Sequence, residues 1–344
     1  MLQEARMARR FTIQNLAEKA GVSVSTIDRI LNGRDKVRDS TAARVLAAAE
    51  DLEFYALATL RERLGAAGPK VRLGFLLQQS HRTFYRMIAD ALRQAAADAG
   101  VAAAVEHMDD LSPEAVSERI LRLGEGVDAL AVVSAEHPRI SQAIETLAAR
   151  GVRTYGLISE LTAACGVGYV GLDNWRLGRT SAWAMTALCK SPGRVGILVG
   201  NHRYRCQELN ESGFRSYCRE HGSGFTLLEP VQTFEDKSIA RDVTEQLLRR
   251  EPDLVGLYIS GGGIVGVLDA MKSSGRSGSI VTIGYELTEH TRAGLMDNVL
   301  SLALAHPIPR LASEAISQMQ DDLRAGIGAG KRVITFDIYG PENI

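Results

Sequence analysis

The stretch TIQNLAEKAGVSVSTIDRILNGRDKVRDSTAARVLAAAEDLEF, residues 12–54, determines the fold of the N-terminal part of this chain. Its apolar residues recur at helical spacing and predict three short helices, over about 12–19, 24–31 and 39–52. Between the first two helices, A-G-V-S forms a turn, because glycine tolerates a left-handed backbone and Ser23 can cap the next helix. Three short helices with such a turn form a helix-turn-helix pattern.

Beyond Pro69 the pattern changes, and short apolar runs alternate with amphipathic stretches to the end of the chain. Strand–helix alternation predicts parallel sheets with helices on both faces. The strands are too many for one open sheet, so we expect two doubly wound lobes around a central cleft. The predicted organisation is a small all-α helix-turn-helix domain (1–54), a hinge or linker (55–70), and a two-lobed α/β domain for ligand binding and dimerisation (71–344).

The composition is that of an ordinary globular protein, with 344 residues, 45% hydrophobic residues and a net charge of −1. These values argue against a disordered chain, a coiled coil and a protein that is basic throughout. The charge is divided unevenly, since residues 1–46 contain nine basic and five acidic side chains, whereas residues 47–344 contain 31 and 36. This division favours a small basic DNA-binding domain joined to a mildly acidic ligand-binding domain.

Several classes of protein lack support in the sequence. No apolar stretch approaches the ~18 residues of a membrane span, and the N-terminus is charged where a signal peptide needs an apolar core. The four cysteines form no C-x-x-C pair and no metal pattern with the seven histidines. G-x-S-x-G, H-E-x-x-H and P-loop motifs do not occur. We therefore expect a cytoplasmic protein that is not an enzyme and needs no metal or cofactor.

Residues 12–54 closely resemble the DNA-binding head of the lactose-repressor/galactose-repressor (LacI) family. The match runs through the A-G-V-S turn, S-T-I-D-R-I-L-N-G and V-R-x-x-T-x-x-R-V-L. The remainder is similar to the effector domain of that family, which shares its fold with periplasmic sugar-binding proteins. The resemblance implies a repressor that binds a palindromic DNA operator and senses a small polar ligand, a sugar or polyol. A homodimer is expected because one head reads only a half-site.

In such a head, residues that open the second helix face base edges, and nearby hydroxyl and amide side chains suit phosphate oxygens. Arg29 can make a bidentate contact to guanine. Asp28 and Arg38 stand where the family more often has serine. The predicted DNA-contacting residues are Thr12, Ser23, Val24, Ser25, Thr26, Arg29, Asn32, Arg38, Thr41 and Leu64.

The hinge departs from the family pattern. In the family, a leucine from each subunit enters the minor groove and kinks the DNA. Here the usual Pro-Asn pair is absent, and ungapped alignment places Arg63 where the leucine belongs, with Leu64 one position later. Two alternatives stay open: Leu64 is the wedge in a shifted register, or minor-groove arginines replace the wedge.

Ligands of such folds bind at the carboxyl ends of the strands, so polar residues that follow the apolar runs are candidates. A polar residue and then aromatics follow the first strand, as in sugar-binding relatives where aromatic rings stack on a pyranose. Glu286 stands where the family has aspartate and His306 where it often has glutamine; the acids suit hydroxyls or a cationic amine. The candidates are Gln78, Arg82, Phe84, Tyr85, Glu160, Asp173, Asn174, Glu208, Phe234, Gly261, Glu286 and His306.

One motif favours a different ligand. Residues 261–266 match G-x-G-x-x-G after an apolar run, and Glu286 follows at the spacing of a ribose-binding acid. A regulator that senses a dinucleotide is therefore an alternative. The glycines can instead let the backbone approach an occupant of the cleft, or form a tight turn. A small-molecule binding protein with a vestigial head is a further alternative.

Overall fold

The computed structural model describes residues 11–33, 37–52, 54–64, 71–222 and 224–344. It forms two compact units, residues 1–71 and 72–344, which we call the head unit and the effector unit. The finer division at residues 54 and 70 stays a prediction. The described part of the head unit contains the helices α1 (Ile13–Ala20), α2 (Val24–Leu31), α3 (Asp39–Asp51) and α4 (Leu57–Arg63).

The apolar sides of these four helices meet in one small core. Leu16, Ile27 and Val45, from α1, α2 and α3, are fully buried in it. Leu60 of α4 is also fully buried there. The α4 helix, which falls in the predicted hinge segment, therefore packs onto the other helices of the head unit.

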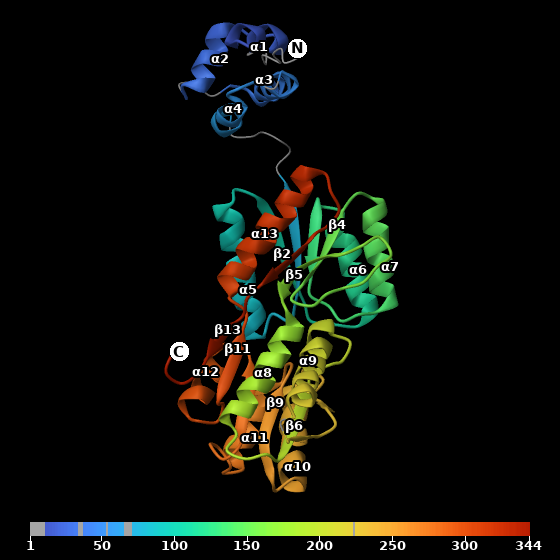
Figure 1. Ribbon diagram of the computed structural model, residues 1–344. Coiled ribbons are helices and arrows are strands. Elements are labelled where there is room, and N and C mark those ends of the chain that lie inside the picture. Colours follow the sequence, from blue (N-terminus) through green and yellow to red (C-terminus); the bar gives the residue numbers. More distant parts are fainter. Residues whose placement is uncertain (1–10, 34–36, 53, 65–70, 223) are drawn as a thin grey trace, which may run out of the picture. The chain divides into compact units, whose positions relative to one another are not determined.

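The first lobe of the effector unit is built on an all-parallel sheet of strand order β12-β5-β4-β3-β1-β2. Its strands are β1 (Arg72–Gln78), β2 (Ala102–Met108), β3 (Ala129–Val132), β4 (Arg153–Leu157), β5 (Gly168–Leu172) and β12 (Lys331–Ile334). One pair of helices lies on each side of this sheet (Figure 1): α5 (Thr83–Asp98) with α13 (Ile308–Ala325), and α6 (Pro113–Gly124) with α7 (Pro138–Ala149).

The second lobe has the strand order β13-β11-β10-β9-β6-β7, and β8 also pairs with β6. All pairs are parallel except β11 with β13. The strands are β6 (Arg194–Val199), β7 (Thr226–Leu227), β8 (Val231–Gln232), β9 (Leu254–Ile259), β10 (Val281–Tyr285), β11 (Leu302–Ala305) and β13 (Asp337–Tyr339). The helices are α8 (Asn174–Leu188) packed on α9 (Arg205–His221), α10 (Lys237–Arg250) packed on α11 (Ile264–Ser273), and α12 (Glu289–Met296).

The chain passes between the two lobes three times, at residue 173, at residues 306–307 and at residues 335–336. The predicted fold class, a small helical head and two doubly wound parallel-sheet lobes, is confirmed. Parallel strands with helical crossovers direct all their carboxyl ends to one edge of each sheet. The three short crossings bring these edges together, and candidate ligand residues cluster there.

Asp322 ties the last crossover helix to the first sheet. Its side chain is buried and accepts hydrogen bonds from the Tyr155 hydroxyl at 2.8 Å, the Gly330 N–H at 2.7 Å and Gln318 Nε2 at 2.9 Å. Burial acts to raise the pKa of Asp322, but these hydrogen bonds outweigh it and hold the pKa below its ordinary value. The carboxylate is therefore stabilised in its charged form.

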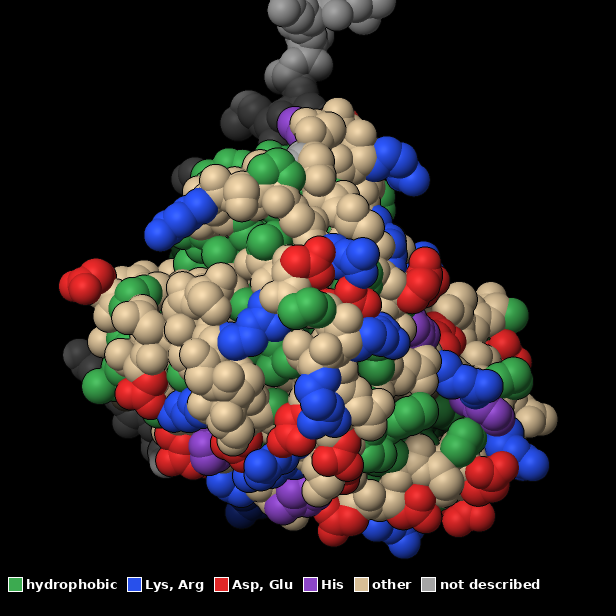
Figure 2. Space-filling model, turned by 90° about the horizontal axis from the view of Figure 1, so that it is seen from below, with side chains coloured by type: hydrophobic (Ala, Val, Ile, Leu, Met, Phe, Trp, Pro, Cys, Tyr) green, Lys and Arg blue, Asp and Glu red, His purple; other side chains and the backbone are tan. Residues whose placement is uncertain are grey.

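Figure 2 shows acidic and basic side chains interspersed over one face of the effector unit. Opposite charges also pair along α10 and α11, where Lys237 pairs with Asp269 at 3.0 Å and Arg241 pairs with Glu245 at 2.9 Å. Such a surface attracts DNA phosphates only weakly, because the two signs of charge cancel. Among the described helices, none has the length and apolar character needed to cross a membrane.

Candidate DNA-binding surface and effector site

The turn between α1 and α2 positions α2, the predicted DNA-recognition helix. Gly21 ends α1 with φ of 62°, a left-handed conformation that glycine adopts without strain. Ser23 caps α2, since its Oγ accepts the Thr26 N–H at 3.2 Å and lies 2.8 Å from the Thr26 hydroxyl. Because the apolar side of α2 faces the core of the head unit, Val24 and Arg29 lie on the exposed side.

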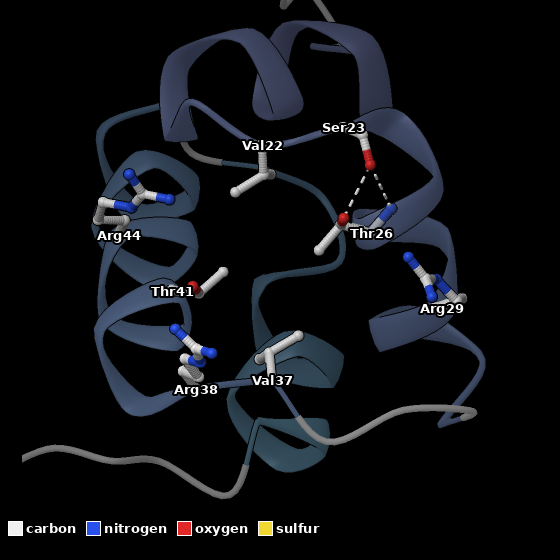
Figure 3. A pocket seen from close by; sticks show the side chains of 8 residues that line it. All are labelled: Val22, Ser23, Thr26, Arg29, Val37, Arg38, Thr41 and Arg44. Carbon is white, nitrogen blue, oxygen red and sulfur yellow. Dashed lines mark hydrogen bonds between the residues drawn. The ribbon is translucent and has the colours of Figure 1, made fainter.

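A hollow of about 460 Å³ lies beside α2, between it and the start of α3. Figure 3 shows the eight side chains around it: Val22, Ser23, Thr26, Arg29, Val37, Arg38, Thr41 and Arg44. Three of them are arginines, three carry hydroxyls, and no carboxylate is among the eight. Guanidinium groups and hydroxyls are the side chains that bind DNA phosphate oxygens most often. We call these eight residues the basic hollow.

Five of the predicted DNA-contacting residues, Ser23, Thr26, Arg29, Arg38 and Thr41, line the basic hollow. Arg44 lines it too but was missed by the sequence analysis. It stands three residues after Thr41, so the two side chains share one side of α3. The spacing of Thr41 and Arg44 within V-R-x-x-T-x-x-R could have indicated Arg44 as a DNA-contacting residue.

The other predicted DNA-contacting residues lie around the ends of the helices. Thr12 caps α1, and Asn32 follows α2, where its Nδ2 donates to the Asp28 carbonyl at 2.9 Å. The Oγ of Ser25 lies 2.9 Å from that of Ser23. All of these side chains are exposed. Their capping bonds and a contact to DNA are compatible, and the contact stays a prediction.

Leu64 follows the end of α4 and is half-buried against the core of the head unit. Arg63, just before it, is exposed. Leu64 thus packs within the head unit. To enter the minor groove as a wedge, it would have to give up this packing. Both alternatives for the hinge stay predictions.

In the effector unit, the end of β1 contacts the second lobe. Gln78 is buried, donates from Nε2 to the Tyr204 hydroxyl at 2.5 Å and accepts from the Tyr85 hydroxyl at 3.0 Å. The Cys206 N–H donates to Ser159 Oγ at 3.3 Å, a second bond between the lobes. Burial raises the pKa of Tyr85 and of Tyr204, so both hydroxyls stay protonated. Gln78 and Tyr85 therefore lie where the two lobes meet.

Glu286 and His306 meet at the ends of β10 and β11. His306 Nδ1 lies 2.6 Å from Glu286 Oε1, and both side chains are buried. The ring of Phe84, from the first lobe, lies 5.9 Å from the His306 ring. Two buried polar atoms have no hydrogen-bond partner here, His306 Nε2 and the Tyr285 hydroxyl. Burial, and then the Glu286 carboxylate, raise the pKa of Tyr285, so its hydroxyl remains a donor. Unpartnered buried polar atoms are unfavourable unless a ligand or water supplies the partner.

Arg82 forms an ion pair between the lobes, since its Nη1 lies 2.7 Å from Glu235 Oε2 in the second lobe. Its Nη2 also donates to the Glu235 carbonyl at 2.5 Å. Glu235 was missed by the sequence analysis, which singled out Phe234 instead. Phe234 is 61% exposed as a whole residue, whereas the side chain of Glu235 is 12% exposed. The structure thus points the acid, and not the aromatic ring, toward the first lobe.

The G-x-G-x-x-G segment contacts groups of the chain itself. A Cβ on Gly261 would lie 2.4 Å from Gln207 Oε1, and one on Gly266 would lie 1.9 Å from the Lys237 carbonyl oxygen. These glycines are thus required for the packing of α11 against α10 and of the β9 end against Gln207. The dinucleotide alternative gains no support from the structure, because internal packing accounts for the glycines.

The remaining candidates have local partners. Asn174 is buried, and its Nδ2 donates to the Tyr169 hydroxyl at 3.1 Å, whereas its Oδ1 has no partner. Asp173 caps α8, and Glu160 pairs with Lys331 at 3.1 Å. Glu208 is exposed and bonded to Arg205 one turn earlier on its own helix. The described residues contain no group of three or more His, Cys, Asp or Glu side chains that could hold a metal ion.

Two family models match this chain. Residues 12–56 match the bacterial regulatory proteins of the lacI family, and residues 73–326 match a periplasmic binding protein domain. The chain belongs to the LacI family. This LacI-family protein is a transcription regulator with a helix-turn-helix head and a sugar-binding-protein-like domain, and the family is not one of enzymes.

Two curated relatives represent the two parts. This LacI-family protein is 29% identical over 131 residues to the maltose regulon regulatory protein MalI of Escherichia coli K12. That match spans 37% of either chain. The chain is also 23% identical over 263 residues to the ribose import binding protein RbsB of Bacillus subtilis, which covers 74% of this chain and 82% of RbsB.

Solved structures show the same fold for the effector unit of the LacI-family protein. A solute-binding protein from Agrobacterium vitis bound with alpha-D-tagatopyranose is 18% identical, with a TM-score of 0.72 over 80% of this chain and 96% of that chain. The glucose-galactose binding protein GanP of Geobacillus stearothermophilus is 16% identical, with a TM-score of 0.73 over 80% and 98%.

Proposed function

We propose that this LacI-family regulator is a repressor that binds a palindromic operator as a homodimer and senses a sugar or polyol between its lobes. The observation that carries the proposal is the basic hollow beside α2. It contains three guanidinium groups and three hydroxyls next to the exposed start of α2, the predicted DNA-recognition helix. One head of this size reads a half-site, so a palindrome calls for two copies.

The lining of the effector site supports a polar ligand with an apolar face. The ring of Phe84 offers a surface for stacking, while His306 Nε2 and the Tyr285 hydroxyl lack partners inside the protein. Hydroxyl groups of a sugar or polyol can donate to the first atom and accept from the second. The solved sugar-binding structures named above share this fold, which supports the same class of ligand.

The three crossings between the lobes support a simple coupling mechanism. Short connections permit the lobes to rotate against one another while the lobes themselves stay rigid. A ligand that contacts both lobes favours one arrangement over the other by its differential affinity. Such coupling between two binding sites is typically worth about 1–3 kcal/mol, or roughly 5- to 150-fold in operator affinity.

The proposal is tested with the full-length protein on operators selected from a random DNA library. Fluorescence anisotropy titrations at several salt concentrations, with and without a panel of sugars and polyols, measure affinity, stoichiometry and coupling. We expect two protomers on a palindromic sequence, a steep salt dependence, and a change of at least fivefold with one compound.

Other outcomes would contradict the proposal. Weak binding without sequence preference and without salt dependence would favour a binding protein with a vestigial head. A dinucleotide that alters operator affinity, with no effect of any sugar or polyol, would favour the dinucleotide alternative.

A further inference from the structure

The carboxylate of Glu235 accepts hydrogen bonds from three groups of the protein. Arg82 Nη1 donates to Oε2 at 2.7 Å, and Gln207 Nε2 and the Gly262 N–H donate to Oε1 at 2.6 Å and 3.0 Å. The Glu235 side chain is 12% exposed. The three donors come from three separate segments and from both lobes, so the carboxylate bridges the lobes.

The surroundings of this carboxylate have the shape of an anion site. A Cβ on Gly200, after β6, would lie 1.8 Å from Glu235 Oε1, and one on Gly262, after β9, would lie 1.7 Å from Oε2. Any side chain at either position would expel the carboxylate. Glycines thus follow the ends of two adjacent strands, β6 and β9, where the Glu235 carboxylate lies. The donors around it are a guanidinium, an amide and a backbone N–H, which together suit a carboxylate.

The segment that delivers the carboxylate is strained. Phe234 and Glu235 are consecutive, neither is glycine, and both have positive φ, 51° and 60°. Side chains rarely adopt this backbone conformation, and two in succession are rarer. In the same turn, Phe234 is 61% exposed to solvent. The conformation that inserts Glu235 therefore carries backbone strain and leaves an aromatic residue exposed to solvent.

We propose that Glu235 is an internal stand-in for an anionic group of the effector. Arg82, Gln207 and the Gly262 N–H form a carboxylate subsite, and the effector is an acidic sugar whose carboxylate replaces that of Glu235. This inference rests on the proposed function and deepens it. Arg82 stands two residues before Phe84, whose ring centroid lies 5.9 Å from that of His306. The displaced Glu235 turns to solvent, where its charge is readily hydrated.

The subsite itself is tested with acetate as the probe. Removing the carboxylate in Glu235→Ala leaves Arg82 Nη1 and Gln207 Nε2 without their acceptor, and we expect acetate to raise the thermal midpoint of this variant above that in chloride at equal ionic strength. The wild type and Glu118→Ala, which removes an exposed glutamate on α6, should show no difference between the two anions. Equal midpoints of Glu235→Ala in acetate and chloride would overturn the subsite.

The class of effector is tested by calorimetric titration of the wild type, Glu235→Ala and Glu235→Gln. The probes are D-gluconate, D-galactonate, D-glucuronate and D-galacturonate, each compared with D-glucose or D-galactose. We expect at least one acid to bind the wild type tenfold more tightly than its neutral parent. Glu235→Ala should strengthen its binding at least another tenfold, because an internal competitor is removed. The Glu235→Gln variant, whose amide fits the same space without charge, should lie between the two.

The remaining outcomes separate this inference from the proposed function. If neutral sugars bind and alter operator affinity while no acid is preferred, the proposed function stands and the acidic effector is wrong. If Glu235→Ala weakens the binding of every sugar, Glu235 is a direct contact or a latch, and the stand-in is wrong. If no sugar, polyol or acid binds any variant, sugar sensing itself fails.

Discussion

His306 Nδ1 lies 2.6 Å from Glu286 Oε1, and the backbone N–H of His306 donates to Oε2 of the same carboxylate at 3.1 Å. Both oxygens of Glu286 are therefore engaged by one residue at the second crossing between the lobes. With Nδ1 facing the carboxylate, the other ring nitrogen of His306, Nε2, is buried and has no hydrogen-bond partner. Glu286, which has φ of 65°, thus orients His306 and leaves the histidine to meet the ligand.

The first prediction concerns this histidine. His306→Ala removes the unpartnered Nε2 and the ring that packs against Phe84, and we expect binding of the sugar identified by titration to weaken by about tenfold, the scale of one hydrogen bond of about 1.4 kcal/mol. Calorimetry measures the effect, and operator binding without ligand should stay within twofold. An unchanged sugar affinity would remove His306 from the effector site.

The second prediction separates the roles of the arginines in the basic hollow. Arg38→Gln and Arg44→Gln should each weaken all operator variants alike and reduce the magnitude of the slope of log affinity against log salt by about one. Arg29→Gln should instead relax sequence preference at one position of the half-site. Anisotropy on a set of single-base operator variants measures both effects. Arg93→Gln, on α5 of the effector unit, is the matched control.

The third prediction concerns the hinge. Leu64→Ala should weaken operator binding at least ~tenfold if the leucine enters the minor groove, since one unstacking contact is worth about 1.4 kcal/mol. Because Leu64 also packs on the core of the head unit, thermal unfolding of the variant must be compared with the wild type. Full operator affinity in a gel-shift titration would rule out the wedge and favour the arginine alternative.

The fourth prediction uses cysteine reactivity to report on the contact between the lobes. Burial raises the pKa of Cys206 to about 12, so at pH 8 only about one thiol in ten thousand is the reactive thiolate. Cys165 is exposed. Iodoacetamide should therefore label Cys165 in the folded protein and leave Cys206 unmodified, as read by peptide mass spectrometry. Labelling of both at one rate would show that the lobes separate readily at Cys206.

The fifth prediction is a pH dependence of stability at Asp322. Asp322→Asn replaces an acceptor oxygen by a donor among three donors, and we expect a loss of about 1–3 kcal/mol of unfolding free energy at pH 7. The folded pKa lies below the unfolded value of about 3.9. The stabilisation by the charged form is therefore present above that value and lost as the pH falls through the folded pKa.

Urea unfolding of the wild type and the variant at pH 7 and at pH 3 measures this effect. The difference between the two proteins should shrink at the lower pH. A difference independent of pH would mean that the charge of Asp322 contributes nothing to stability.

Some elements of the effector unit were not predictable from local pattern. The edge strand β2, Ala102–Met108, begins with three alanines, which have weak strand propensity, and half-exposed residues follow. The apolar run 333–339 looks like one strand in the sequence, yet it is divided between β12 in the first sheet and β13 in the second. A run of apolar residues indicates that each residue is buried, but it does not indicate which sheet the strand joins.

The first three helices of the head unit were predictable because their signals are local. Caps such as Ser23 and Gly21 act within one turn of the chain, and the helical spacing of apolar residues selects the buried side. The sequence alone therefore determined the first three helices of the head unit, the exposed side of α2 and the class of the two lobes.

Only the tertiary structure decided how the effector site is arranged. The partners of Glu286 and Arg82 lie 20 and 153 residues away in sequence, and the Gly262 contact to Glu235 spans 27 residues. No local rule orders such pairs, because hydrogen bonds across separate strand ends depend on which strands are neighbours and how the lobes close. The sequence supplied the candidate residues, and folding decided that Glu235, and not Phe234, occupies the space between the lobes.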